Sequence, residues 1–120
     1  MHESIYDDFV TKYLDITEST SVVGDQWSST TYQGPQVSKA QYNRILSYVE
    51  AGKSEGATLA TGGVPFKNVG DGKGFFIEPT VFTSVKEDMK VYQEEVFGPF
   101  CVVATFKDEE EAIRMANNTT

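Results

Sequence analysis

The run from Pro99 to Phe106 constrains the fold more than any other part of this 120-residue sequence. It is aromatic, β-branched or small throughout, with Thr105 as its one hydroxyl-bearing residue. Such a run predicts a strand that is buried on both faces, since a half-exposed strand would alternate apolar and polar residues. A strand covered on both sides needs further layers of structure around it.

Two helices are predicted ahead of this strand. The first covers residues 3 to about 19, with Ser4 as a plausible N-cap. Its apolar residues recur at four-and-three spacing and define one stripe of Ile5, Phe9, Tyr13 and Ile16, which is flanked by Tyr6, Val10 and Leu14. The second helix starts at Ser38, where the pattern Ser-x-x-Gln matches a capping box in which Ser38 and Gln41 each satisfy the other's backbone N–H.

The remaining segments alternate between extended and helical patterns. Residues 57–60 predict a strand, and residues 63–74 a loop or hairpin tip. Residues 75–85 predict an extended segment that is bent or placed at a sheet edge by Pro79. A short helical turn is expected within residues 89–95, and Asp108-x-x-Glu111 starts a final helix. The order is helix, helix, strand, strand, strand, helix, which indicates an α/β fold.

Charge and cysteine content exclude several functions. Eighteen Asp and Glu residues stand against ten Lys and Arg, for a formal charge of −8, which disfavours binding to nucleic-acid phosphates or an anionic membrane. The single cysteine excludes an intramolecular disulfide framework and a multi-cysteine zinc site. No apolar run approaches the roughly 20 residues that span a bilayer. We expect an acidic domain of a reducing compartment.

The remaining reactive side chains and the glycosylation sequons do not indicate a functional site. Cys101 lies in the predicted strand, where a free cysteine is usually a small buried hydrophobe. His2 has no second histidine, so no metal is expected there, and a frayed terminus is the default. The acids Glu109–Glu111 point in different directions on a helix and fit its first turn. Overlapping glycosylation sequons start at Asn117 and Asn118, but such triplets are common by chance.

The segment Glu94–Pro99 is the one dense cluster of chemistry-bearing residues. A Gly-Pro corner fixes the backbone, so that Glu95 and Phe97 can present a carboxylate and a flat ring to one ligand. A carboxylate can accept hydrogen bonds from both hydroxyls of a ribose. The alternative is an ordinary loop with an exposed acid and a core phenylalanine, and the spacing alone leaves it open.

The same residues resemble a known family. Glu94-Glu95-Val96-Phe97-Gly98-Pro99 resembles the E-E-x-F-G-P signature of the aldehyde dehydrogenase superfamily. Further segments resemble that family in order and approximate spacing: Gly34-Pro35-Gln36-Val37, Gln41-Tyr42-Asn43-Arg44-Ile45, Gly62-Gly63, Gly74-Phe75-Phe76-Ile77-Glu78-Pro79-Thr80-Val81 and Ala116-Asn117-Asn118-Thr119. The resemblance extends over essentially the whole chain.

The resemblance implies that residues 1–120 are a segment of an aldehyde dehydrogenase catalytic domain, with open strand–helix layers that are incomplete. On this basis the nucleophilic cysteine, the general-base glutamate and the cofactor-binding domain lie outside the chain. The family oxidises aldehydes to carboxylic acids with NAD(P)+ through a cysteine thioester. We therefore expect the 120 residues alone to be inactive, and some of their apolar surface to lack a partner.

The resemblance also assigns cofactor-binding residues: Glu95 to the nicotinamide-ribose hydroxyls, Phe97 beside the nicotinamide, and Gln41 and Arg44 toward the ribose. Relatives often carry lysine at the position of Arg44. A capping role for Gln41 competes with its ribose role. The expected cofactor is NAD, with NADP as the alternative; no metal is expected.

The expected partners are a small aldehyde and a second copy of the parent protein, with neither nucleic acid nor membrane. The expected compartment is the cytoplasm, with the mitochondrion as the alternative. Two other functions stay open: a non-catalytic binding or antigenic fragment, and a non-enzymatic paralogue of the family.

Overall fold

A computed structural model of the chain describes residues 1–118. Two single-turn 3-10 helices (η), four α-helices and three strands follow in this order: η1 (Glu3–Ile5), α1 (Tyr6–Thr20), α2 (Lys39–Ser54), β1 (Thr58–Thr61), η2 (Gly70–Gly72), β2 (Thr80–Thr83), α3 (Lys90–Gln93), β3 (Phe100–Val102) and α4 (Glu109–Ala116). The predicted order of elements is confirmed, including the short helical turn before β3, and the fold class is α/β.

The three strands form one sheet with β2 at its centre. β1 pairs with β2 in the antiparallel sense, with Leu59 opposite Phe82, and β3 pairs with β2 in the parallel sense, with Val81 opposite Cys101. All four residues of β2 are buried. Of the two alternatives for Pro79, a bend or a place at a sheet edge, the second is therefore wrong. Pro79 precedes the strand, so its missing N–H costs no ladder hydrogen bond.

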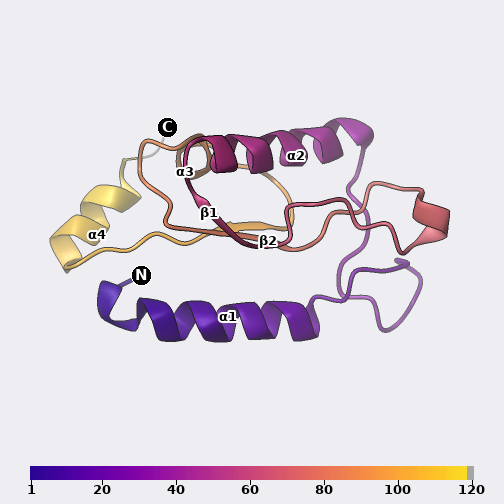
Figure 1. Cartoon of the computed structure of the whole chain (residues 1–120), viewed down its shortest axis with the longest axis horizontal. Helices are drawn as coiled ribbons and strands as arrows, with labels where there is room; N and C mark the ends of the chain where they lie inside the picture. The colour runs from indigo at the N-terminus through magenta and orange to yellow at the C-terminus, as the bar shows by residue number, and fades with distance from the viewer. Residues whose placement is uncertain (119–120) are drawn as a thin grey trace.

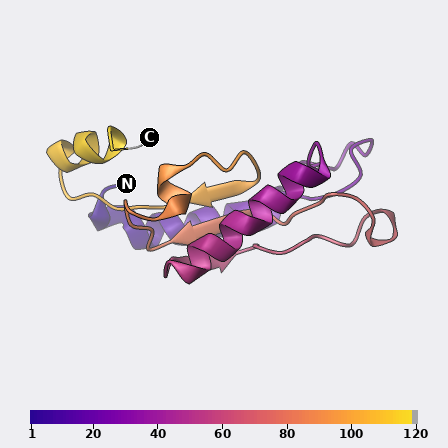
Figure 2. The ribbon, with the colours of Figure 1, turned by 90° about the horizontal axis from the view of Figure 1, so that it is seen from above.

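Helices α1 and α2 lie on opposite sides of the strands (Figure 1), and the view from above agrees (Figure 2). The main core fills the space between α2 and the sheet. Gly52 lets the two approach closely, because a Cβ atom there would lie 3.1 Å from the Phe82 ring. The buried members of this core are Ile45, Tyr48, Val49, Ala57, Ile77, Phe82, Val85, Met89, Val91 and Val96.

Helix α1 buries a stripe that is shifted from the predicted one. Of the predicted stripe, Tyr13 is half-buried, whereas Ile5, Phe9 and Ile16 are 54%, 41% and 60% exposed. The other half-buried apolar side chains are the flanking Tyr6, Val10 and Leu14. The apolar face of α1 is broader than the surface it covers, so part of it meets solvent. This agrees with the expected apolar surface without a partner.

The start of the chain also differs from its prediction. Ser4 is not the N-cap of α1, because a 3-10 turn precedes the helix and the imidazole Nδ1 of His2 accepts a hydrogen bond from the Ser4 N–H at 3.2 Å. The terminus around His2 is not frayed either: the Glu3 N–H donates to the Phe106 carbonyl and the Phe106 N–H to the Met1 carbonyl, both at 2.9 Å. These bonds hold the N-terminus against the chain after β3.

The strand predicted over residues 99–106 is shorter than expected. β3 covers Phe100–Val102, which are half-buried, and Phe106 instead forms an isolated bridge with His2. Within residues 1–118, β3 is an edge strand paired only with β2, so its outer side lacks the cover that full burial requires. Cys101 is accordingly half-buried rather than buried.

In the described part of the chain, no helix has the length and apolar character needed to cross a membrane.

Candidate functional site

The segment from Glu94 to Pro99 connects α3 to β3 and is held at both ends. At its start the Glu94 N–H donates to the Lys90 carbonyl at 3.0 Å, and the backbone of Glu94 is extended. At its end the Thr80 N–H donates to the Pro99 carbonyl at 2.8 Å, which joins the Gly-Pro corner to the central strand. We call residues 94–99 the site loop.

Gln41 holds the middle of the site loop from the first turn of α2. Its side-chain amide Nε2 donates to the carbonyl of Val96 at 3.1 Å and to the carbonyl of Phe97. The Ser38 hydroxyl accepts a hydrogen bond from the Gln41 backbone N–H at 3.2 Å, as the capping pattern predicts. The reciprocal half of the predicted capping box is wrong, because the Gln41 side chain reaches the loop instead of the helix terminus.

Arg44 lies on the same face of α2, since residues three apart in a helix are neighbours. Its guanidinium Nη2 donates to the Glu95 carbonyl at 3.2 Å and to the Tyr48 hydroxyl at 3.2 Å. Gln41 and Arg44 together bind the three successive carbonyls of residues 95–97. Both long side chains therefore hold the loop backbone.

Phe97 has an unusual conformation for a large side chain. It is 71% exposed and its φ is +56°, in the left-handed region that non-glycine residues rarely adopt. Its neighbour Val96 is only 8% exposed and fixes the loop to the core. Neither the left-handed backbone nor the exposed ring stabilises the fold, which makes Phe97 a candidate for a functional contact.

Glu94 and Glu95 differ in their surroundings. The Glu94 carboxylate accepts a hydrogen bond from the Tyr48 hydroxyl at 2.5 Å. The Glu95 carboxylate is exposed and has no hydrogen bond or ion pair with any of residues 1–118. A surface hollow of about 370 Å³ lies along the loop, lined by Val91, Tyr92, Glu94, Glu95, Val96, Phe97, Gly98, Phe100 and Val102.

The structure thus brings the four predicted residues together at one loop. Glu95 and Phe97 present free groups, whereas Gln41 and Arg44 contact the backbone that carries them. Sequence reasoning missed Tyr48, although it lies four residues after Arg44 and seven after Gln41 on one helix face. Nothing in the sequence indicated that Glu94 would turn toward Tyr48.

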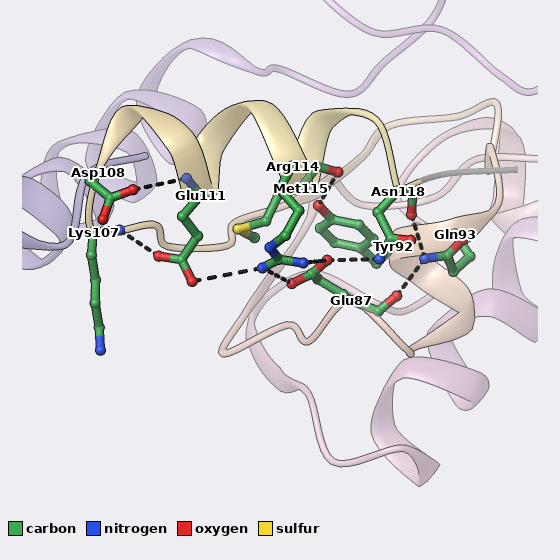
Figure 3. A network of polar contacts seen from close by, with 9 residues as sticks. All are labelled: Glu87, Tyr92, Gln93, Lys107, Asp108, Glu111, Arg114, Met115 and Asn118. Carbon is green, nitrogen blue, oxygen red and sulfur yellow. Dashed lines mark hydrogen bonds and ion pairs between the residues drawn. The ribbon is translucent and has the colours of Figure 1, made fainter.

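A second polar network joins α4 to the chain around α3 (Figure 3). Arg114 donates from Nη1 and Nη2 to the two carboxylate oxygens of Glu87, at 2.9 and 2.7 Å. Asn118 Nδ2 donates to Glu87 at 2.8 Å, and Gln93 Nε2 donates to the carbonyls of Glu87 and Asn118. Arg114 first, and then Asn118, lower the pKa of Glu87. This network fixes the start of the site loop indirectly, through α3.

The predicted start of α4 is confirmed. The Asp108 carboxylate accepts a hydrogen bond from the Glu111 N–H at 2.9 Å. Glu111 in turn accepts one from the Lys107 N–H at 2.8 Å. Of the two sequons, Thr119 and Thr120 lie outside the described residues. Within the described chain, no three His, Cys, Asp or Glu side chains gather as metal ligands would.

Comparison with known proteins identifies the family. The model of the aldehyde dehydrogenase family matches residues 1–120. The chain belongs to this family. This aldehyde dehydrogenase chain is 52% identical over 120 residues to an aldehyde dehydrogenase of Davidiella tassiana, and 53% identical over 119 residues to aldehyde dehydrogenase family 2 member C4 of Arabidopsis thaliana.

Solved structures agree with the aldehyde dehydrogenase fold. A betaine aldehyde dehydrogenase of Staphylococcus aureus in complex with NAD+ superimposes with a TM-score of 0.90 at 40% identity, covering 98% of this chain and 23% of that one. A variant of the same enzyme, also with NAD+, gives a TM-score of 0.92 at 39% identity, covering 98% of this chain and 24% of that one. The two sequence relatives are covered to 23% of their length, against 100% and 99% of this chain. The chain therefore has the fold of part of a larger domain.

Proposed function

We propose that residues 1–120 are a segment of the catalytic domain of an NAD(P)-dependent aldehyde dehydrogenase, in which the site loop binds the nicotinamide half of the cofactor. The observation that carries the proposal is the Glu95 carboxylate, which has no partner among residues 1–118, on the same loop as the exposed Phe97 ring and on a backbone held by Gln41 and Arg44. Family membership and the NAD+ complexes of the Staphylococcus aureus relative support it.

The groups present fit a nicotinamide ribose. A carboxylate with free lone pairs can accept hydrogen bonds from two ribose hydroxyls, and an exposed aromatic ring can lie against a planar heterocycle. Bound NAD(P)+ supplies the hydride acceptor for the oxidation of an aldehyde to a carboxylic acid. The contribution of this chain is to position that ring, because hydride transfer requires close and correctly oriented reactants.

Gln41 and Arg44 belong to the proposed site through the loop that they hold. Each donates to a carbonyl of the peptides that carry Glu95 and Phe97. Their contribution is to limit the movement of the loop, which lowers the cost of ordering it when the cofactor binds. This assigns to them a positioning role in place of direct contact with the ribose.

Replacing Glu95 tests the proposal. In the full-length enzyme that contains this segment, Glu95→Gln is expected to raise the KM for NAD+ and to slow hydride transfer, at a cost of about 1–3 kcal/mol for a charge-assisted hydrogen bond. Glu110→Gln is the matched control, because Glu110 is also exposed, undergoes the same charge change and lies on α4. Unchanged cofactor affinity and kinetics in Glu95→Gln would overturn the proposal.

The proposal extends to the properties of the parent enzyme. Its substrate is a small aldehyde, it assembles as a homo-oligomer, and it works in the cytoplasm or the mitochondrion. The 120 residues alone are expected to show no turnover with an aldehyde and NAD+. Measurable turnover above a blank reaction would contradict this, and would place the catalytic groups within the chain itself.

A further inference from the structure

We propose that Tyr48 and Glu94 form a positioning pair that directs the Glu95 carboxylate toward the cofactor. The inference rests on the proposed function of the site loop. It adds two residues that touch neither the substrate nor the cofactor and that act through the backbone between Glu94 and Glu95.

The hydroxyl of Tyr48 has two hydrogen-bond partners. It donates to the Glu94 carboxylate at 2.5 Å and accepts from Arg44 Nη2 at 3.2 Å. Two cations flank its ring: Lys90 Nζ lies 5.0 Å and Arg44 Cζ 5.5 Å from the centroid. The side chain is 3% exposed and packs in the core. Tyr48 is therefore a rigid donor, because its ring and its hydroxyl are both held in place.

The direction of Glu95 follows from the direction of Glu94. The backbone of Glu94 is extended, with φ −117° and ψ 147°. Successive side chains of an extended chain point to opposite sides. Val96 is buried, and Phe97 is exposed like Glu95. With Glu94 bound to α2 through Tyr48, we infer from this alternation that the carboxylate of Glu95 lies on the side away from α2.

The Tyr48–Glu94 hydrogen bond is expected to contribute little to the stability of the fold. Glu94 is exposed, so removal of its side chain leaves no cavity in the core. The loop is already held by Gln41 and by the buried Val96. What the Tyr48–Glu94 bond adds is a fixed orientation at the residue directly before Glu95. Its loss should therefore affect cofactor binding more than folding.

The test compares single and double variants of the full-length enzyme, with the Kd and KM for NAD+, the KM for the aldehyde and the Tm as readouts. Glu94→Ala is expected to raise the Kd for NAD+ about threefold to tenfold, the effect of losing one hydrogen bond, and Tyr48→Phe at least as much, because it also removes the acceptor of Arg44 Nη2. The double variant should be no worse than Tyr48→Phe, because the Tyr48–Glu94 hydrogen bond is already lost there. The KM for the aldehyde should stay unchanged.

Two further variants separate positioning from a structural role. Glu94→Gln keeps an acceptor for the Tyr48 hydroxyl and should restore most of the NAD+ affinity that Glu94→Ala loses. Tyr42→Phe is the matched control: Tyr42 lies on the same helix, packs against the Phe75 ring, and its hydroxyl has no hydrogen bond among the described residues. We expect Tyr42→Phe to bind NAD+ normally.

The possible results separate the two proposals. If Glu95→Gln weakens NAD+ binding while Tyr48→Phe and Glu94→Ala behave like Tyr42→Phe, the positioning pair is refuted and the proposed function stands. Additive losses in the double variant would also refute the pair. If Glu95→Gln has no effect, the proposed function fails, and the pair fails with it. Should Tyr48→Phe not fold, the exposed position of Glu94 still allows Glu94→Ala and Glu94→Gln to decide.

Discussion

Gly98 lies directly against the side chain of Ile45. A Cβ atom at Gly98 would approach Ile45 Cγ1 to 2.8 Å and would lie closer still to Cδ1. Ile45 is completely buried on α2 and belongs to the main core, so its displacement would require repacking of its neighbours. Because Gly98 has no side chain, the site loop can pack directly against α2, the helix that also supplies Gln41 and Arg44.

Gly98→Ala should consequently displace the site loop. We expect a loss of about 1–3 kcal/mol in the free energy of unfolding, typical of overpacking against a rigid core, together with weaker NAD+ binding in the full-length enzyme. Urea unfolding and cofactor titration measure the two effects. Gly34→Ala is the control, because its Cβ would meet only the Cβ of Gln26 at an ordinary 3.5 Å. Equal behaviour of the two variants would contradict the prediction.

We expect the backbone conformation of Phe97 to lower the stability of the fold and its ring to contribute to cofactor binding. With φ at +56°, Phe97→Gly relieves backbone strain that Phe97→Ala retains, so the glycine variant should be more stable than the alanine variant by about 1 kcal/mol. Both variants lose the ring and should raise the KM for NAD+ of the full-length enzyme to a similar extent. Thermal unfolding with steady-state kinetics tests this, and a less stable Phe97→Gly would show that the backbone is not strained.

The Glu87–Arg114 pair should make the attachment of α4 depend on pH. Arg114 lowers the pKa of Glu87 in the folded chain, so the stabilisation is present above the ordinary glutamate pKa of about 4.3 and is lost as the pH falls through the lowered folded pKa. Arg114→Gln should therefore be less stable than the natural chain near neutral pH, and the difference should disappear in strong acid.

Thermal unfolding at a series of pH values measures this difference. Lys12→Gln is the control, since Lys12 is exposed on α1, undergoes the same charge change and has no polar partner among the described residues. A stability difference for Arg114→Gln that stays constant between neutral pH and strong acid would contradict the assignment.

The pKa of Tyr13 should depend on the half-buried thiol of Cys101 in β3. The neighbouring Cys101 thiol, followed by burial, raises the pKa of Tyr13 to about 12. Because the pKa is raised, the stabilising effect is complete below the ordinary value near 10 and is lost as the pH rises through about 12. Cys101→Ala should lower the pKa of Tyr13 toward 10, measured by NMR of the ring carbons. Val102→Ala keeps the thiol and serves as the control.

Much of the local structure was predictable because it depends on neighbouring residues. Ser38 and Asp108 cap their helices as the sequence predicts, since a capping hydroxyl or carboxylate needs only a backbone N–H three residues away. The site loop was also predictable: the Gly-Pro corner limits the backbone, and Glu95 and Phe97 remain on its open side. That these two bind a cofactor remains a prediction.

Tertiary structure decided which partner each long side chain takes. The Gln41 side chain could have formed a hydrogen bond at the N-terminus of its own helix, but it donates to the carbonyls of the site loop instead. The hydroxyl of Tyr48 meets Glu94 across 46 positions of sequence. Which stripe of α1 faces the sheet was likewise settled by the surface available to it. Caps and turns follow from bonds within a few residues, whereas these choices depend on distances that exist only after α2, the sheet and the loop have packed together.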